Sequence, residues 1–264
     1  MRIEDLDRAR DTDAAAEQLS ELASLGIDWD GDVVVQSGRA HEHAVALAHL
    51  KDLGLVYECT CTRREILEAP RAPHAPFGAY PGTCRDRSDE DRAIARAAIA
   101  PRRPALRLRV PEELRQQRFD DELLGIVVGT VDDFVLQRGD GVIAYNLAVV
   151  VDDAQMGVDQ VVRGDDLASS TPRQIVLQSL LDLPTPSYAH VPLVLGPSGA
   201  RLAKRDGAVT LEDLAHRGVS AAQVLNMIAQ SLGLASTDEV VSTESLLERF
   251  QPGRLPREPW IWSG

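Results

Sequence analysis

The stretch AYNLAVVVDD, residues 144–153, decides the fold class of this chain. It overlaps a largely apolar run over residues 142–151 that contains three consecutive valines. Such a run is typical of a central strand in an α/β sheet, because helices cover both faces of that strand. The sequence therefore predicts a buried strand here. Asp152 and Asp153 follow at its carboxyl end, where ligands bind in open α/β sheets.

Other patterns predict strands and helices around this run. Apolar residues at helical spacing indicate helices that end at Gly26 and Gly54. Ser88, with Asp91 three residues on, indicates the start of another helix. The segment Gly139-Asp140-Gly141 is a hairpin turn signal. Predicted strands lie at residues 55–61, 105–110, 126–128, 134–137 and 190–195, and predicted helices at residues 12–25, 41–53, 171–181 and beyond residue 210.

The bulk composition narrows the class of protein. The chain is 44% hydrophobic and 26% charged, as is usual for a soluble globular protein. Its net charge of −13 argues against broad non-specific binding to nucleic acid, although it permits a local basic groove on an acidic body. Since no long apolar run or apolar signal core is present and cysteines are few, we expect a cytoplasmic protein that does not bind membranes. We also expect it to be a monomer.

All three cysteines lie in one region, as Cys59, Cys61 and Cys84. Three thiols are an odd number for disulfides and one too few for an all-cysteine zinc site, so a zinc ion here needs a fourth ligand of another type. His74 and Tyr80 both lie between the second and third cysteine. Zinc chemistry in general favours the imidazole. Three unrelated buried thiols are the alternative interpretation.

Two further groups of charged residues are candidates for a site. Arg163 follows the predicted central strand and could bind a carboxylate or a phosphate in a bidentate way, through two N–H groups of its guanidinium. The basic segment Arg201-Leu202-Ala203-Lys204-Arg205 follows a predicted strand directly, which suits a phosphate-binding loop. By contrast, His41, His43 and His49 have no acidic or thiol partner at metal-ligand spacing and are predicted to be solvated helix residues.

In combination and order, several motifs resemble the catalytic domain of class I glutamyl-tRNA synthetases over nearly the whole chain. The basic loop is similar to the family's KMSKS loop in a degenerate form, with Arg201 first and Ala203 where serine is frequent. The segments that carry the resemblance are Arg2-Ile3-Glu4-Asp5-Leu6-Asp7, Gln36-Ser37 with Arg39, Asp140-Gly141, Tyr145 to Asp153, Arg163-Gly164-Asp165-Asp166-Leu167, and Arg201 to Arg205.

The resemblance implies roles for individual residues. Lys204 would neutralise the leaving phosphates of ATP as the catalytic lysine, and magnesium would accompany the ATP. Glu4, Tyr145 and Arg163 would bind L-glutamate, with Glu4 opposite the ammonium group and Arg163 on a carboxylate. The remaining ATP-binding positions would be Arg201, Leu202, Ala203 and Arg205.

The cysteine array resembles the zinc site of the glutamyl-queuosine tRNA(Asp) synthetase family, a truncated branch of these enzymes. In that family the fourth ligand is a tyrosine, which implies a structural Zn²⁺ held by Cys59, Cys61, Tyr80 and Cys84. The implied activity is tRNA-independent activation of glutamate with ATP, followed by transfer to queuosine in tRNA(Asp). A glutamyl-tRNA synthetase that charges tRNA(Glu), disfavoured by the short chain after the KMSKS-like loop, and a non-catalytic tRNA- or zinc-binding relic are the alternatives.

The expected architecture is an α/β, Rossmann-like class I synthetase core with a zinc-binding insertion and a short helical C-terminal segment. The resemblance also implies a HIGH motif, on the first strand and helix of the core, before Arg2-Ile3-Glu4, where only Met1 stands. Either the start is an internal methionine of a longer protein, which the intact downstream motifs favour, or the chain is a fragment. For this polypeptide itself we expect no glutamyl-adenylate. The expected segments are the first part of the core (1–56), the insertion (57–125), the second part of the core with the KMSKS-like loop (126–208) and the helical segment (209–264).

Overall fold

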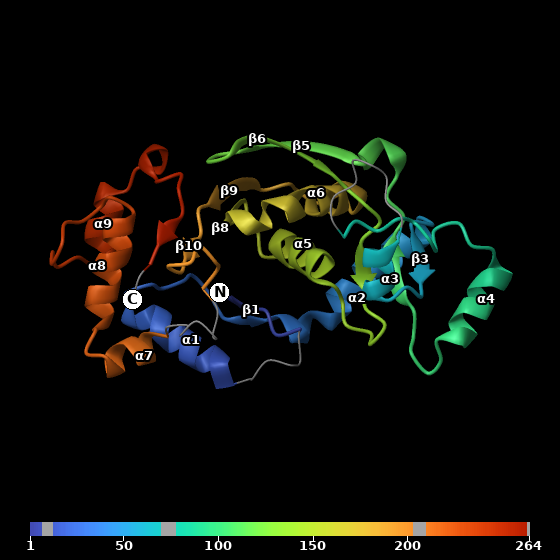
Figure 1. The fold of residues 1–264 in the computed structure, drawn as a ribbon, viewed down its shortest axis with the longest axis horizontal. Coiled ribbons are helices and arrows are strands. Elements are labelled where there is room, and N and C mark those ends of the chain that lie inside the picture. The colour runs from blue at the N-terminus through green and yellow to red at the C-terminus, as the bar shows by residue number, and fades with distance from the viewer. Residues whose placement is uncertain (7–12, 70–77, 203–209, 263–264) are drawn as a thin grey trace. The chain divides into compact units, whose positions relative to one another are not determined.

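The computed structural model describes residues 1–6, 13–69, 78–202 and 210–262 (Figure 1). The chain forms two compact units. The larger unit comprises Val35–Val161 and Leu167–Ala189, and the smaller one comprises Met1–Val34, Val162–Asp166 and His190–Gly264. The four segments expected from the sequence stay a prediction.

Two sheets organise the larger unit. The first has the strand order β3-β4-β7 and is antiparallel throughout, and Cys59 at the end of β3 pairs with Ala105. The second has the order β6-β5-β9-β8, in which β5 and β6 form an antiparallel hairpin and β5 runs parallel to β9. The strands are β3 (Val56–Cys59), β4 (Ala105–Leu108), β5 (Gln116–Asp121), β6 (Gly125–Thr130), β7 (Val135–Gln137), β8 (Gln160–Gly164) and β9 (Ser187–Val191), and the last two end in the smaller unit.

Helices pack on these strands to form the main core. Helix α6 contacts both strands of the β5–β6 hairpin and helix α5, and α5 contacts α2 and β7 (Figure 1). Thirteen buried apolar side chains, among them Leu50, Leu108 and Leu177, make up this core. The helices of the larger unit are α2 (Ala40–Asp52), α3 (Arg63–Glu68), α4 (Asp89–Ala98), α5 (Tyr145–Gln155) and α6 (Thr171–Leu180), with 3₁₀ turns at Gln36–Arg39, Glu112–Leu114 and Asp165–Ser170, the last of which begins in the smaller unit.

The prediction of a strand at residues 142–151 is wrong, because most of this stretch belongs to helix α5. Only Ile143 forms a bridge to β7, after the predicted turn at residues 139–141. Val149, Val150 and Val151 are at most 5% exposed. Since α2 and α6 both pack against α5, residues on several sides of the helix are buried. Valine disfavours a helix by only about 0.5 kcal/mol, whereas burial of its side chain stabilises by about 1.5–3 kcal/mol in either conformation. An all-apolar run therefore does not distinguish the two.

Most other predicted elements are confirmed. The expected helix caps are present, since Ser88 Oγ accepts a hydrogen bond from the Asp91 amide and Gly26 and Gly54 have positive φ. The strand expected at residues 190–195 corresponds to the end of β9 and the short strand β10. No helix among the described residues is long and apolar enough to span a bilayer.

The smaller unit is mainly helical, as predicted for the chain beyond Thr210. Glu21 of α1 accepts a hydrogen bond from the Leu211 amide at 2.9 Å, and Thr243 donates to the Gly26 carbonyl at 3.0 Å. These bonds connect the N-terminal helix to the C-terminal helices. The elements are β1 (Arg2–Ile3), α1 (Asp13–Ser24), β2 (Val34–Val35, across the boundary of the units), β10 (Val194–Leu195), α7 (Leu211–His216), α8 (Ala221–Ser231), α9 (Thr243–Arg249), a 3₁₀ turn at Pro252–Arg254 and β11 (Trp260–Ile261), which runs parallel to β10.

The buried carboxylate of Asp152 connects α5 to helix α2 and to the 3₁₀ turn that precedes α2. Asp152 is fully buried and accepts hydrogen bonds from Gln36 Nε2 at 2.8 Å and Arg39 Nε at 2.6 Å. His43 Nε2 lies 2.9 Å from the same carboxylate, and His43 is also fully buried. The prediction that His43 is solvated is therefore wrong. Its environment depends on a residue 109 positions away, which local spacing does not reveal.

We expect Asp152→Asn to destabilise the protein in a pH-dependent way. Burial by itself would raise the pKa of Asp152, but the hydrogen bonds from His43, Arg39 and Gln36 outweigh it and lower the pKa to about 2. A lowered pKa means that the carboxylate stabilises the fold above about pH 4, by about 2–3 kcal/mol, and that this contribution disappears as the pH falls towards 2. Urea unfolding should show the full deficit of the variant at pH 7 and about half of it at pH 3.

The matched control for this experiment is Asp159→Asn, which changes the same charge at an exposed aspartate of the larger unit. It should leave the free energy of unfolding within about 0.5 kcal/mol of wild type at both pH values. Equal deficits of Asp152→Asn at pH 7 and pH 3 would contradict the proposed linkage.

Candidate functional site

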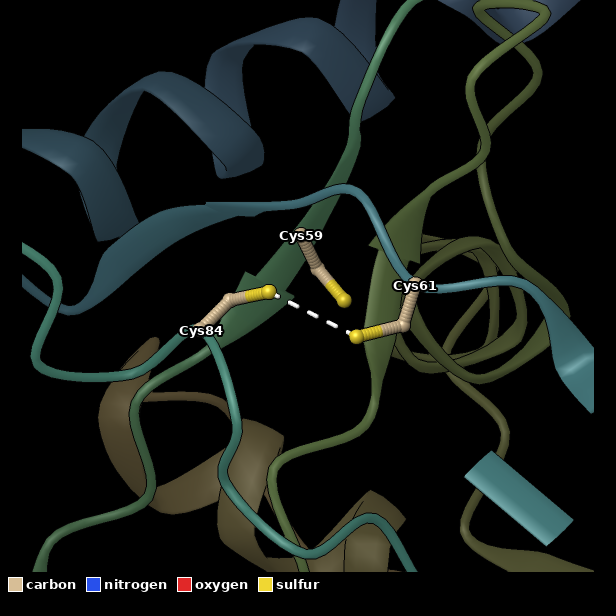
Figure 2. A group of neighbouring side chains, drawn as sticks. All are labelled: Cys59, Cys61 and Cys84. Carbon is tan, nitrogen blue, oxygen red and sulfur yellow. Dashed lines mark hydrogen bonds between the residues drawn. The ribbon is translucent and has the colours of Figure 1, made fainter. Parts of the chain in front are cut away.

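The structure brings the three cysteines together from separate segments of the larger unit (Figure 2). Cys59 is the last residue of β3, and Cys61 lies just before α3, whose N-terminus is fixed by the capping box of Thr62 and Glu65. Cys84 lies in a turn closed by the Arg85 amide and the Gly82 carbonyl. All three sulfur atoms lie within 4.8 Å of one another. The alternative of three unrelated thiols is therefore wrong.

Tyr80 completes a four-donor arrangement. Its Oη lies 3.5 Å from Cys59 Sγ and accepts a hydrogen bond from the Cys84 amide at 2.8 Å. Cys61 Sγ lies 3.5 Å from Cys84 Sγ (Figure 2). A tetrahedral zinc ion with bonds of about 2.3 Å to sulfur and 2.0 Å to oxygen separates two sulfurs by about 3.8 Å and a sulfur from an oxygen by about 3.5 Å. The donor set and its spacing fit zinc, whereas His74 lies outside the described residues.

The surroundings of Tyr80 hold its ring in place. The Tyr80 amide donates to Asp132 Oδ2 at 2.8 Å, and the guanidinium carbon of Arg107 lies 3.8 Å from the centre of the ring. Arg107 is buried and donates to the Asp133 carbonyl at 2.7 Å. A guanidinium stacked on an aromatic ring is an attractive contact that strengthens when water is excluded. The phenol is therefore fixed towards the thiols by contacts that do not involve its hydroxyl.

The proton affinities in this cluster are unequal. A hydrogen bond from Cys59 lowers the pKa of the Cys84 thiol, and the same bond, together with burial, raises the pKa of Cys59. Burial raises the pKa values of Cys61 and Tyr80. Without a cation the cluster thus favours one thiolate, because further negative charges at these distances repel one another. A divalent metal would supply the charge that the other donors need to deprotonate.

The smaller unit contains a second charged arrangement. Arg163, on β8, donates from Nε to Nε2 of His190, on β9, at 3.1 Å. Since Nε2 accepts this bond, His190 carries its proton on Nδ1. His190 is fully buried, so its ring is a rigid support for the guanidinium. Local sequence gives no signal for His190, because Arg163 and His190 are 27 positions apart and only the sheet makes them neighbours.

The first residues of the predicted phosphate-binding loop are described, and the rest are not. Arg201 Nη1 pairs with Asp166 Oδ2 at 2.9 Å, with the arginine side chain 72% exposed. A turn closed by the bond from the Gly196 amide to the Ala200 carbonyl precedes it, and Arg201 bridges to Leu195. Leu202 is 39% exposed. The predicted residues Ala203, Lys204 and Arg205 lie outside the described residues.

The other predicted glutamate-binding residues belong to different units. Glu4 is exposed in the smaller unit, and its carboxylate accepts from Arg2 Nη2 at 2.9 Å. Tyr145 is the first residue of α5 in the larger unit and is 41% exposed. Their roles stay predictions.

Comparison with known proteins gives consistent matches over the whole chain. Residues 1–263 match the family described as tRNA synthetases class I (E and Q), catalytic domain. A protein of Nocardia farcinica named glutamyl-Q tRNA(Asp) synthetase is 58% identical over 261 residues, which cover 99% of this chain and 81% of that protein. Proteins of the same name from Symbiobacterium thermophilum and Cutibacterium acnes are 45% and 48% identical, covering 98% and 100% of this chain and 84% and 78% of theirs.

Solved structures share the fold at lower identity. A glutamate-tRNA synthetase from Elizabethkingia anophelis superposes with a TM-score of 0.77 at 21% identity, covering all of this chain and 61% of that one. A glutamate tRNA ligase from Elizabethkingia meningosepticum gives 0.76 at 21% identity, covering 99% and 60%. This chain thus spans about 60% of the length of those two proteins.

Proposed function

The chain belongs to the class I tRNA synthetase family of glutamyl and glutaminyl enzymes, whose catalytic domain it matches over residues 1–263, and we propose that it glutamylates queuosine in tRNA(Asp). The observation that carries this proposal is the 45–58% identity, over nearly the whole chain, to relatives named glutamyl-Q tRNA(Asp) synthetase. The predicted α/β class I catalytic domain agrees with that membership.

The proposed reaction has two steps. First, the α-carboxylate of glutamate attacks the α-phosphorus of ATP, and pyrophosphate leaves to give glutamyl-adenylate. Second, a hydroxyl of the queuosine cyclopentenediol attacks the activated carbonyl, its proton is lost, and AMP leaves. The first step needs no tRNA. Both steps depend mainly on the positioning of the reactants and on neutralisation of phosphate charge.

Each predicted site residue has a proposed part in these steps. Arg163, held by His190, would bind a carboxylate of glutamate, because a guanidinium with a fixed Nε presents its other N–H groups in a set direction. Glu4 would face the substrate ammonium, and Tyr145 would bound the pocket. Lys204 would neutralise the leaving pyrophosphate of an ATP that carries Mg²⁺. The remaining contacts to ATP would come from Arg201, Leu202, Ala203 and Arg205.

We propose that Cys59, Cys61, Tyr80 and Cys84 hold a structural Zn²⁺. The support is the spacing of the four donors and the burial of three of them. All four positions are taken by protein atoms, which is the arrangement of a structural rather than a catalytic zinc site. The ion would fasten the end of β3 to the start of α3 and to the turn at residues 80–85.

A charging assay tests the proposed function. The protein, expressed from its complete reading frame, is incubated with ATP and labelled glutamate and with tRNA(Asp) that contains queuosine, tRNA(Asp) that lacks it, or tRNA(Glu). We expect incorporation of glutamate only into the queuosine-containing tRNA(Asp). Incorporation into tRNA(Glu) would instead support an ordinary glutamyl-tRNA synthetase, and a protein inactive with all three, even in pyrophosphate exchange, would support a non-catalytic relic.

A further inference from the structure

A groove of about 470 Å³ lies on the larger unit, separate from the four proposed zinc donors. One wall comes from the segment after α4, and the other from the tight turn between β7 and α5. A side chain at Gly139 would collide with the Arg103 carbonyl oxygen, so glycine lets the two walls approach each other. The groove is lined by Pro101, Arg102, Arg103, Ala105, Arg138, Gly139 and Asp140.

The groove is basic on an acidic protein. Arg102, Arg103 and Arg138 are all exposed and face a single carboxylate, Asp140, which accepts from Arg138 Nη2 at 2.6 Å. The stretch at residues 57–125 contains 13 arginines against 12 acidic residues, whereas the whole chain has a net charge of −13. Positive charge is therefore concentrated in this part of the chain.

One wall is held firmly in place. Arg102 Nη2 donates to the Thr60 carbonyl at 2.6 Å, and Thr60 lies between Cys59 and Cys61. On the other wall the Asp140 carboxylate accepts from the Val142 amide at 3.1 Å, which closes the turn. The Arg102 guanidinium is thus held by its own hydrogen bond, and the turn that follows Arg138 is closed, which reduces the conformational entropy lost on binding an anion.

We propose that this groove binds the phosphate backbone of an RNA. Arginines in an exposed groove suit a line of phosphates, because each guanidinium can bind phosphate oxygens with two N–H groups. Three of the seven lining residues are arginines, and only Pro101 and Ala105 carry apolar side chains. The choice of RNA, in particular a tRNA, rests on the proposed function.

Binding of a queuosine-free tRNA(Asp) transcript, measured by anisotropy at several salt concentrations, tests the proposal. We expect Arg103→Gln and Arg138→Gln each to weaken binding about three- to tenfold at low salt and to reduce the slope of log affinity against log salt by about 0.7–0.9. Asp140→Asn keeps the acceptor of the turn but removes the opposing charge, so it should tighten binding about two- to fivefold.

Arg118→Gln is the matched control, since Arg118 is an exposed arginine of the same unit, on β5, that does not line the groove. Affinity and salt slope near wild type for the double variant Arg103→Gln/Arg138→Gln, or an equal loss with Arg118→Gln, would overturn the proposal. So would a double variant that binds the transcript normally but loses glutamate-dependent pyrophosphate exchange, because the groove would then serve ATP.

The binding assay tests the groove and the charging assay tests the proposed function, so either proposal can be refuted while the other stands. If the wild-type protein does not glutamylate queuosine but the groove variants still bind the transcript more weakly than Arg118→Gln, the proposed function is refuted and the groove stands. If charging succeeds while the variants bind like wild type, the function stands and the groove proposal is refuted.

Discussion

Cys84→Ser is expected to remove bound zinc from the protein and to destabilise the larger unit strongly. Cys84 is fully buried, contacts Cys61 at 3.5 Å, and donates its amide to Tyr80 Oη. Because structural zinc sites contribute apparent free energies of about 10–16 kcal/mol, loss of one thiolate should outweigh any other single change in this region. Metal analysis of the purified protein should fall from about one zinc per chain to near zero, with a lower Tm.

Two further variants identify the fourth ligand of the proposed zinc site. Tyr80→Phe keeps the ring against Arg107 and removes only the hydroxyl, so it should lose zinc without losing this packing contact. His74→Ala should leave the zinc content at about one per chain. Zinc lost with His74→Ala and retained with Tyr80→Phe would show that the histidine is the ligand. Wild-type protein purified without stoichiometric zinc would contradict the metal site itself.

Arg163→Gln is expected to have the largest effect on catalysis among the described residues. Removing one partner of a buried, hydrogen-bonded charge pair costs about 2–5 kcal/mol, so kcat/KM for glutamate should fall by about a hundredfold or more. The KM for ATP should change little, since the proposed contact is with the amino acid. Glutamate-dependent pyrophosphate exchange by the protein expressed from its complete reading frame, at varied glutamate and varied ATP, separates the two effects.

His190 provides the matched test of how Arg163 is positioned. His190→Leu removes the acceptor for Arg163 Nε, whereas His190→Gln retains a side-chain acceptor. We expect His190→Leu to raise the KM for glutamate and His190→Gln to raise it less. The two variants should have similar Tm values. A fall in kcat/KM that is equal for glutamate and ATP in Arg163→Gln would contradict a specific role in binding glutamate.

The cysteine cluster and the helix boundaries are the parts that local sequence predicts well. Gly26 and Gly54 follow helices at positions with φ of 75° and 70°, which side-chain-bearing residues rarely adopt. Ser88 and Asp91, which form a helix cap, lie three positions apart. These features depend on backbone conformation within a few positions, and the sequence shows them directly. Likewise, three cysteines and no other thiol in the chain limit a thiol-based site to one place.

Tertiary structure decided the conformation of the very stretch that indicates the fold class. AYNLAVVVDD is apolar enough for either a central strand or a core helix, and it forms most of α5 because α2 and α6 pack against it. The same packing brings Asp152 to His43 across 109 residues, and the second sheet brings Arg163 to His190 across 27. The sequence alone determined which apolar runs are buried, where helices are capped and which residue types are grouped. The partners of those residues depend on contacts distant in sequence, whose free energies are set only when the elements pack together.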